Sequence, residues 1–170
     1  AGNEAERAAD LQAALNDPKC AAILCARGGY GTVRIIDAIS WENFIKHPKW
    51  LIGYSDLSVI HNTLQNLGFA SLHAIMPLEF ATNSPESLRL LREALFGKSY
   101  TIETGAHPFN RAGKVTGEVV GGNLSMLYSC LGSSTALDTD GKMLFLEDRD
   151  EYLYHIDRMM FNLRRNGYLN

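Results

Sequence analysis

A serine stands where a short apolar run passes directly into a helical pattern, and this junction constrains the fold more than any other part of the chain. Residues 50–53 are apolar and end in glycine, Ser55 follows, and apolar side chains then recur at helical spacing over residues 57–67 until Gly68. A strand that turns at once into a helix places the residue at the turn on a sharp bend, beside free helix N–H groups. Ser55 is therefore interpreted either as an exposed nucleophile or as the N-cap of the helix.

Short apolar runs alternate with helical patterns along most of the chain. Strands are expected at residues 20–25, 50–53, 70–73, 115–120 and 143–146. Helices are expected at residues 4–15, 57–67, 124–131 and 152–163, and from a cap at Thr32 to Ile39. Residues 121–123 are expected to form a turn in which Asn123 caps the next helix. This alternation predicts an α/β fold, with a parallel, Rossmann-like sheet in an N-terminal domain and part of a second α/β domain behind it.

Glycine and proline interrupt the pattern at residues 97–114, which are expected to link the two domains. The N-terminal domain is placed at residues 1–96 and the C-terminal domain at residues 115–170. The chain of 170 residues has no initiator Met, and its second domain holds few elements for a closed core. We therefore expect it to be the internal part of a longer protein.

Composition excludes several classes of function. The net charge of −3 provides no basic surface for nucleic acid. No apolar run approaches the ~20 residues of a membrane span, so no membrane segment is expected. Three cysteines without a CxxC spacing argue against a disulfide framework or a zinc site, and buried thiols are the simpler interpretation.

Three glycines in residues 27–31 follow the first expected strand. Glycines let backbone N–H groups approach an anion closely, and open α/β sheets bind ligands at this end of their strands. The loop is not a P-loop, because no Lys-Ser/Thr pair follows it. The alternative is a tight turn without a ligand.

Glu147 and Asp148 follow the last expected strand, where a carboxylate can orient a histidine or simply favour a helix start. His73 ends a strand and is the one histidine with a position suited to a general base. An esterase-like hydrolase that uses His73 therefore stays open as an alternative.

Four segments together resemble the LD-carboxypeptidase family of serine peptidases, family S66, which includes murein tetrapeptide carboxypeptidases and microcin-immunity proteins. The matching segments are residues 22–31, 53–56 (Gly-Tyr-Ser-Asp), 121–124 (Gly-Gly-Asn-Leu) and 146–148 (Leu-Glu-Asp), the last with residues 154–159. Their order and spacing match the family over nearly the whole chain. The resemblance implies two α/β domains with the active site between them.

The resemblance also implies roles for individual residues. Ser55 is the nucleophile, and Glu147 orients the catalytic histidine. The oxyanion hole uses the N–H of Asp56 and that of Gly28 or Gly29. No Gly-His segment of the family's type occurs among the 170 residues, so the triad histidine is expected outside this chain.

The implied activity is hydrolysis of the L-to-D peptide bond that releases terminal D-Ala from murein tetrapeptides during cell-wall recycling. Arg27 and Asn123 are expected at the substrate, and no metal or other cofactor is implied. The resemblance further implies a cytoplasmic homodimer that binds neither nucleic acid nor a membrane. The alternative is a catalytically incompetent fragment, or a module that binds a peptide or nucleotide-peptide without the triad histidine.

Overall fold

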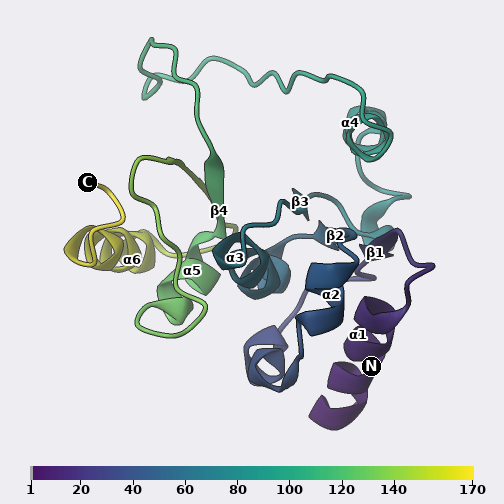
Figure 1. Ribbon diagram of the computed structural model, residues 1–170. Helices are drawn as coiled ribbons and strands as arrows, with labels where there is room; N and C mark the ends of the chain where they lie inside the picture. Colours follow the sequence, from purple (N-terminus) through teal and green to yellow (C-terminus); the bar gives the residue numbers. More distant parts are fainter. Residues whose placement is uncertain (1) are drawn as a thin grey trace.

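Two separate parallel sheets form the framework of the chain (Figure 1). The computed structural model describes residues 2–170. The first sheet has the order β1 (Ala22–Leu24), β2 (Trp50–Gly53), β3 (Leu72–His73). The second pairs β4 (Val119–Asn123) with β5 (Met143–Glu147). Parallel pairing in both sheets confirms the predicted α/β class.

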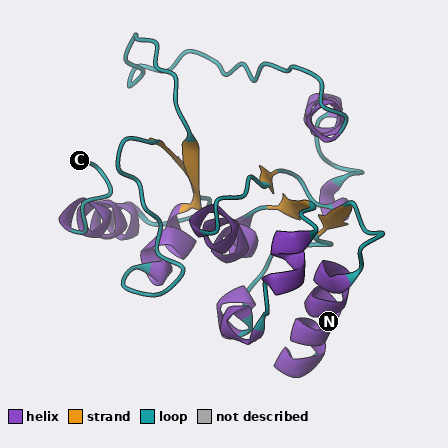
Figure 2. Cartoon of the chain, viewed as in Figure 1, coloured by secondary structure: helices purple, strands orange, loops and turns teal. Residues whose placement is uncertain are grey.

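Six helices surround these sheets in the described part of the chain (Figure 2). They are α1 (Glu4–Asn16), α2 (Glu42–Lys46), α3 (Ser58–Asn66), α4 (Pro85–Leu95), α5 (Leu124–Cys130) and α6 (Leu153–Arg165). The helices α2 and α4 were not predicted, although Ser84 caps α4 and a proline opens it, which is a recognisable start signal. Among residues 2–170, none of the helices combines the length and apolar character needed to cross a membrane.

The helix predicted from Thr32 to Ile39 is wrong. The structure has two 3-10 turns there, Thr32–Arg34 and Ile36–Ala38. Thr32 caps nothing, because its hydroxyl and its N–H both donate to Asp56 instead. The β-branched side chains of this segment also favour a regular helix less than straight-chain ones do, and three isoleucines, Ile35, Ile36 and Ile39, are buried here.

The turn predicted at residues 121–123 is also wrong, because β4 continues through all three residues. Gly121 and Gly122 have φ of 127° and 155°, values that few residues other than glycine adopt. A Cβ on Gly121 would lie 1.9 Å from the carbonyl oxygen of Phe145 on β5. Because Gly121 has no side chain, the backbone of β4 can approach the backbone of β5 closely here. Asn123 caps α5 as predicted, accepting the N–H of Met126.

Two hydrophobic cores lie on either side of α3. The first packs α1, β2 and the inner face of α3 around Phe44, Leu51 and Leu64. The second gathers β4, α5 and α6 around Leu127 and Leu163. The two cores are compatible with the proposed domains, whose boundaries at residues 96 and 115 stay a prediction.

Helix α3 joins the two units, and it lies between them in Figure 1. The side chain of Asn62 donates to the carbonyl of Thr135 at 3.1 Å in a buried contact. At the start of the helix, the hydroxyl of Ser58 accepts the N–H of Asn123 at 3.0 Å. The helix that follows Ser55 is thus hydrogen-bonded to the second unit at both of these points.

The segment between α4 and β4 contains neither helix nor strand, and it runs as a long loop across the top of Figure 2. Its residues are exposed throughout, including Phe109 at 85%. This agrees with the linking role expected of residues 97–114.

We predict that Gly121→Ala destabilises the chain by more than about 3 kcal/mol, because the new methyl group clashes with backbone rather than with a movable side chain. Chemical denaturation monitored by circular dichroism measures the change. Gly117→Ala is the control, since nothing lies within 4 Å of its added Cβ and its effect should stay within about 0.5 kcal/mol. Equal stabilities of the two variants would contradict the role given to Gly121.

Candidate active site

The residues singled out from the sequence gather at the carboxyl ends of the strands. The loop of residues 27–31 follows β1 and Ser55 follows β2, while Asn123 and Glu147 end β4 and β5 side by side. Open parallel sheets bind ligands at this edge. The two sheets therefore present their ligand-binding edges to one region.

Ser55 lies on a strained bend. Its φ is 63°, in the left-handed region, whereas Tyr54 before it is fully extended. A non-glycine residue in this conformation costs roughly 1–2 kcal/mol. The side chain of Ser55 caps neither the 3-10 turn Ser55–Leu57 nor α3. The structure thus excludes the N-cap interpretation and agrees with the bend expected of an exposed nucleophile.

Gly28 closes the glycine loop onto this serine. A Cβ on Gly28 would lie 3.2 Å from the Cβ of Ser55 and 3.4 Å from its hydroxyl oxygen. Within residues 2–170, the N–H groups of Gly28, Gly29 and Asp56 donate to no acceptor. They are therefore available to an oxyanion, and their assignment to the oxyanion hole remains a prediction.

The carboxylate of Asp56 fastens the loop to the bend. One oxygen, Oδ2, accepts the N–H of Thr32 at 3.0 Å and its hydroxyl at 2.7 Å, and the contact is buried. Hydrogen bonds to a charged acceptor are roughly twice as strong as neutral ones. This pair holds the end of the glycine loop at a constant position relative to Ser55.

Glu147 is the acid at the carboxyl end of β5 in the second sheet. Its Oε1 lies 3.7 Å from Nε2 of His73, and within the described residues no donor reaches that buried oxygen. Burial raises the pKa of Glu147, and neighbouring Asp148 adds to this, while the amide of Asn123 counteracts it. A carboxylate oxygen without a donor is able to accept the N–H of a histidine.

His73 lies beside Glu147 but, at 3.7 Å, beyond hydrogen-bond distance. Burial, and then nearby His61, lower the pKa of His73 to about 4, so the ring is neutral at pH 7 and forms no ion pair with Glu147. Its second nitrogen, Nδ1, is buried near Gly122 and has no partner among residues 2–170. No hydrogen bond joins His73 to Ser55 in the described part of the chain. The geometry therefore disfavours the esterase-like alternative.

His61 supports the bend from behind. Its Nε2 contacts the carbonyl of Gly53 at 2.8 Å, and its Nδ1 contacts the hydroxyl of Ser71 at 2.7 Å. Burial lowers the pKa of His61, so the ring is neutral. Because a carbonyl only accepts, the proton resides on Nε2, and the serine hydroxyl donates to Nδ1. The sequence did not predict this role, since the spacing showed only that His61 does not reach Ser55.

Arg27 and Asn123 differ in their freedom to bind substrate. Arg27 is exposed, and its Nε donates to the carbonyl of Gly28. The side chain of Asn123 caps α5 through its oxygen and donates to Asp148 through its nitrogen at 3.3 Å. Both substrate roles remain predictions, and that of Asn123 would require it to exchange a hydrogen bond.

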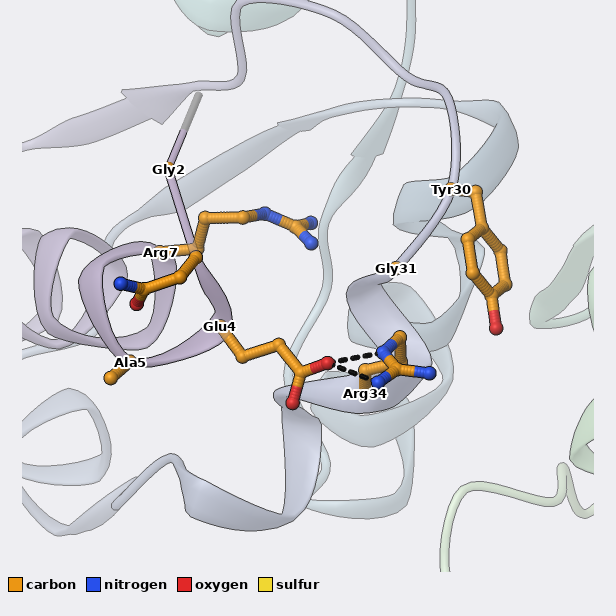
Figure 3. Close-up of a pocket in the computed structure, with 8 residues that line it drawn as sticks. Gly2, Glu4, Ala5, Arg7, Tyr30, Gly31 and Arg34 are labelled. Carbon is orange, nitrogen blue, oxygen red and sulfur yellow. Dashed lines mark hydrogen bonds and ion pairs between the residues drawn. The ribbon is translucent and has the colours of Figure 1, made fainter.

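A cavity of about 190 Å³ opens beside Ser55, with Arg27, Gly28 and Met76 in its lining. A second hollow, of about 560 Å³, lies at the far end of the glycine loop (Figure 3). There Arg34 pairs with Glu4, and Arg7 approaches Gly31. Only the first of these two contains the candidate nucleophile.

The fold and the site together define a parallel α/β protein with a serine on a strained bend at the ligand-binding edge of its sheets. A model of the LD-carboxypeptidase N-terminal domain matches residues 1–74, and one of the LD-carboxypeptidase C-terminal domain matches residues 116–170. The chain belongs to the LD-carboxypeptidase family.

Individual relatives agree with this family. A probable murein peptide carboxypeptidase of Bacillus subtilis is 41% identical over 181 residues, which cover 99% of this chain and 55% of the relative. The crystal structure of muramoyltetrapeptide carboxypeptidase from Oxalobacter formigenes has a TM-score of 0.85 at 28% identity, covering 99% of this chain and 58% of that one. An MccF-like protein from Bacillus anthracis shares the fold, with a TM-score of 0.83 at 23% identity and coverage of 97% and 59%. The chain thus spans little more than half the length of these relatives.

We predict that Ser55→Gly is more stable than Ser55→Ala by about 0.5–1 kcal/mol, because glycine adopts the left-handed conformation without strain. Denaturation midpoints of the two variants measure this difference. At Ser58, which lies in α3 with φ of −54°, the order should reverse, and alanine should be the more stable. The same order at both positions would contradict the strain at Ser55.

We also predict that His73 makes the chain less stable in acid. The pKa of His73 falls from its ordinary 6.5 to about 4 on folding, so the unfolded state binds the proton more tightly. Stability is therefore lost as the pH falls from 6.5 towards 4, by at most about 3 kcal/mol. Urea denaturation across this range should show a smaller loss for His73→Leu than for the native chain. Parallel curves would show that His73 does not contribute.

Proposed function

We propose that the protein to which this chain belongs is a serine-type LD-carboxypeptidase that releases terminal D-Ala from murein tetrapeptides. The observation that carries this proposal is the strained bend at Ser55, with Gly28 packed against its hydroxyl. A strained serine beside free backbone N–H groups is the arrangement that acyl transfer requires. The names of the relatives support a carboxypeptidase, and they support a murein peptide as its substrate.

In the proposed reaction, the hydroxyl oxygen of Ser55 attacks the carbonyl carbon of the L-to-D peptide bond. The N–H of Asp56 and that of Gly28 or Gly29 stabilise the oxyanion. The leaving amine takes the proton that the base received from Ser55 and departs as free D-Ala, and water then hydrolyses the acyl-serine ester to regenerate the hydroxyl.

The proposed base is a histidine outside residues 1–170, as the family resemblance implies, and among residues 2–170 no hydrogen bond joins a histidine to Ser55. The free Oε1 of Glu147 would accept the N–H of that histidine and hold it in the tautomer that receives the serine proton. The exposed guanidinium of Arg27, beside the cavity, would bind the terminal carboxylate of the peptide.

From the family resemblance, we further propose that the protein is a cytoplasmic homodimer that takes part in cell-wall recycling.

We predict that Ser55→Ala abolishes D-Ala release by the full-length protein from a murein tetrapeptide. Glu147→Gln should lower kcat by about 10⁴-fold, because the amide favours the wrong histidine tautomer. Quantification of released D-Ala measures both effects. Ser99→Ala and Glu103→Gln are matched controls in the exposed segment before β4, and both should retain native rates.

The alternative is a module that binds a peptide without cleaving it. Calorimetric binding of the tetrapeptide with no D-Ala release from the full-length protein would favour that alternative. Equal release by the native protein and by Ser55→Ala would remove Ser55 from the mechanism.

A further inference from the structure

A glutamate lies in the wall of the cavity that contains the candidate nucleophile. The cavity beside Ser55 is lined by Glu79 and Tyr54 as well as by residues 27–29 of the glycine loop. The proposed reaction assigns no role to Glu79. A carboxylate in this wall contributes its charge to the surroundings of whichever ligand the cavity holds.

The backbone at Glu79 is tied to the glycine loop. Glu79 ends the 3-10 turn Pro77–Glu79, and its N–H donates to the carbonyl of Met76 at 2.9 Å. The N–H of Leu78 donates to the carbonyl of Ala26 at 3.2 Å, directly before the glycine loop. The side chain of Glu79 therefore starts from a backbone position that is fixed relative to the loop lining the same cavity.

One carboxylate oxygen of Glu79 has a donor within residues 2–170, and the other has none. The hydroxyl of Tyr54 donates to Oε1. Burial, and then this hydrogen bond, raise the pKa of Tyr54 to about 12, so the phenol keeps its proton at neutral pH. The second oxygen, Oε2, is buried without a partner in the described residues. Because an unpaired buried polar atom is costly, a donor from outside these residues is expected at Oε2.

The charges of the cavity wall indicate what kind of donor this is. None of the ion pairs within residues 2–170 involves Glu79. Arg27 lines the same cavity, and its Nε donates to the carbonyl of Gly28. The wall thus presents one guanidinium and one carboxylate. A ligand with one negative and one positive group complements both.

The positive group has to come from the residue before the scissile bond. In the proposed reaction D-Ala leaves, and as the terminal residue it contributes a carboxylate and a methyl group but no cation. The carbonyl that Ser55 attacks belongs to the preceding residue. Its side chain is therefore the nearest one that can bring an ammonium group to the cavity.

We propose that Glu79 is a specificity-determining residue, whose Oε2 accepts a hydrogen bond from a side-chain ammonium group on the residue before the terminal D-Ala. This inference rests on the proposed function. Such a charge-assisted hydrogen bond is stronger than one between neutral groups. The cavity accordingly selects peptides with a diamino acid at this position over peptides with an apolar side chain there.

Two synthetic peptides test this selection, one with lysine before the terminal D-Ala and one with norleucine, which keeps the four-carbon chain without the ammonium group. With the full-length protein, kcat/KM for D-Ala release should be at least about tenfold higher for the lysine peptide. In Glu79→Gln this ratio should fall to about twofold or less, because the amide is uncharged while it still accepts from Tyr54. Both rates of a ratio come from one preparation, so partial unfolding of a variant does not change it.

Glu103→Gln, in the exposed segment before β4, is the matched control and should keep the native ratio. Equal kcat/KM for the two peptides in the native protein would overturn the inference, because a neutral donor would then satisfy Oε2. A ratio in Glu79→Gln as large as the native one would overturn it as well, since another residue would then recognise the ammonium group.

Binding separates this inference from the proposed function. Calorimetry with Ser55→Ala should give a Kd for the lysine peptide at least about tenfold below that for the norleucine peptide, and adding Glu79→Gln should remove the difference. If this pattern holds while the native protein releases no D-Ala, the role of Glu79 stands and the proposed function fails. If both peptides bind equally and release D-Ala at equal rates, the proposed function stands and the inference fails.

Discussion

Helix α3 is the element on which the arrangement of the site depends. It begins directly after the Ser55 turn, and its Ser58 hydroxyl holds the backbone of Asn123, next to the end of β5. Its apolar face enters the first core, while Asn62 enters a buried hydrogen bond with the second unit. A single helix therefore fixes the position of Ser55, at the end of the first sheet, relative to Glu147, at the end of the second. The exposed segment between α4 and β4 provides no comparable constraint.

Several buried polar side chains around the Ser55 bend lack a hydrogen-bond partner within the described residues. Among the described residues, five buried side-chain atoms lack a hydrogen-bond partner, and four of them belong to Asp56, His73, Glu79 and Glu147. Buried polar groups are otherwise almost always paired in folded proteins. Their concentration around the Ser55 bend and the end of β5 indicates where a ligand, solvent or another part of the protein supplies hydrogen bonds. The same reasoning underlies the role proposed for Glu147.

The elements that the sequence predicted correctly are those whose structure depends on residues close to them in the chain. The strand before Ser55, the helix after it and the cap at Asn123 each follow from neighbouring residues. The errors arose where a distant partner decides the local structure. Thr32 did not cap a helix because Asp56, 24 residues away, takes its hydroxyl. Gly121 did not form a turn because β5 pairs along it. The Tyr54–Glu79 contact is likewise tertiary and has no signal in local spacing.

The long exposed loop after α4 has a consequence for how the gene can be rearranged. Since α3 aligns the two units through side-chain contacts, the covalent connection across residues 97–114 contributes little to their register. Exposed, unpaired backbone of this kind accepts insertions and new chain ends. The loop is accordingly suited to an inserted segment or to a chain break, with the geometry between serine and glutamate retained by packing alone.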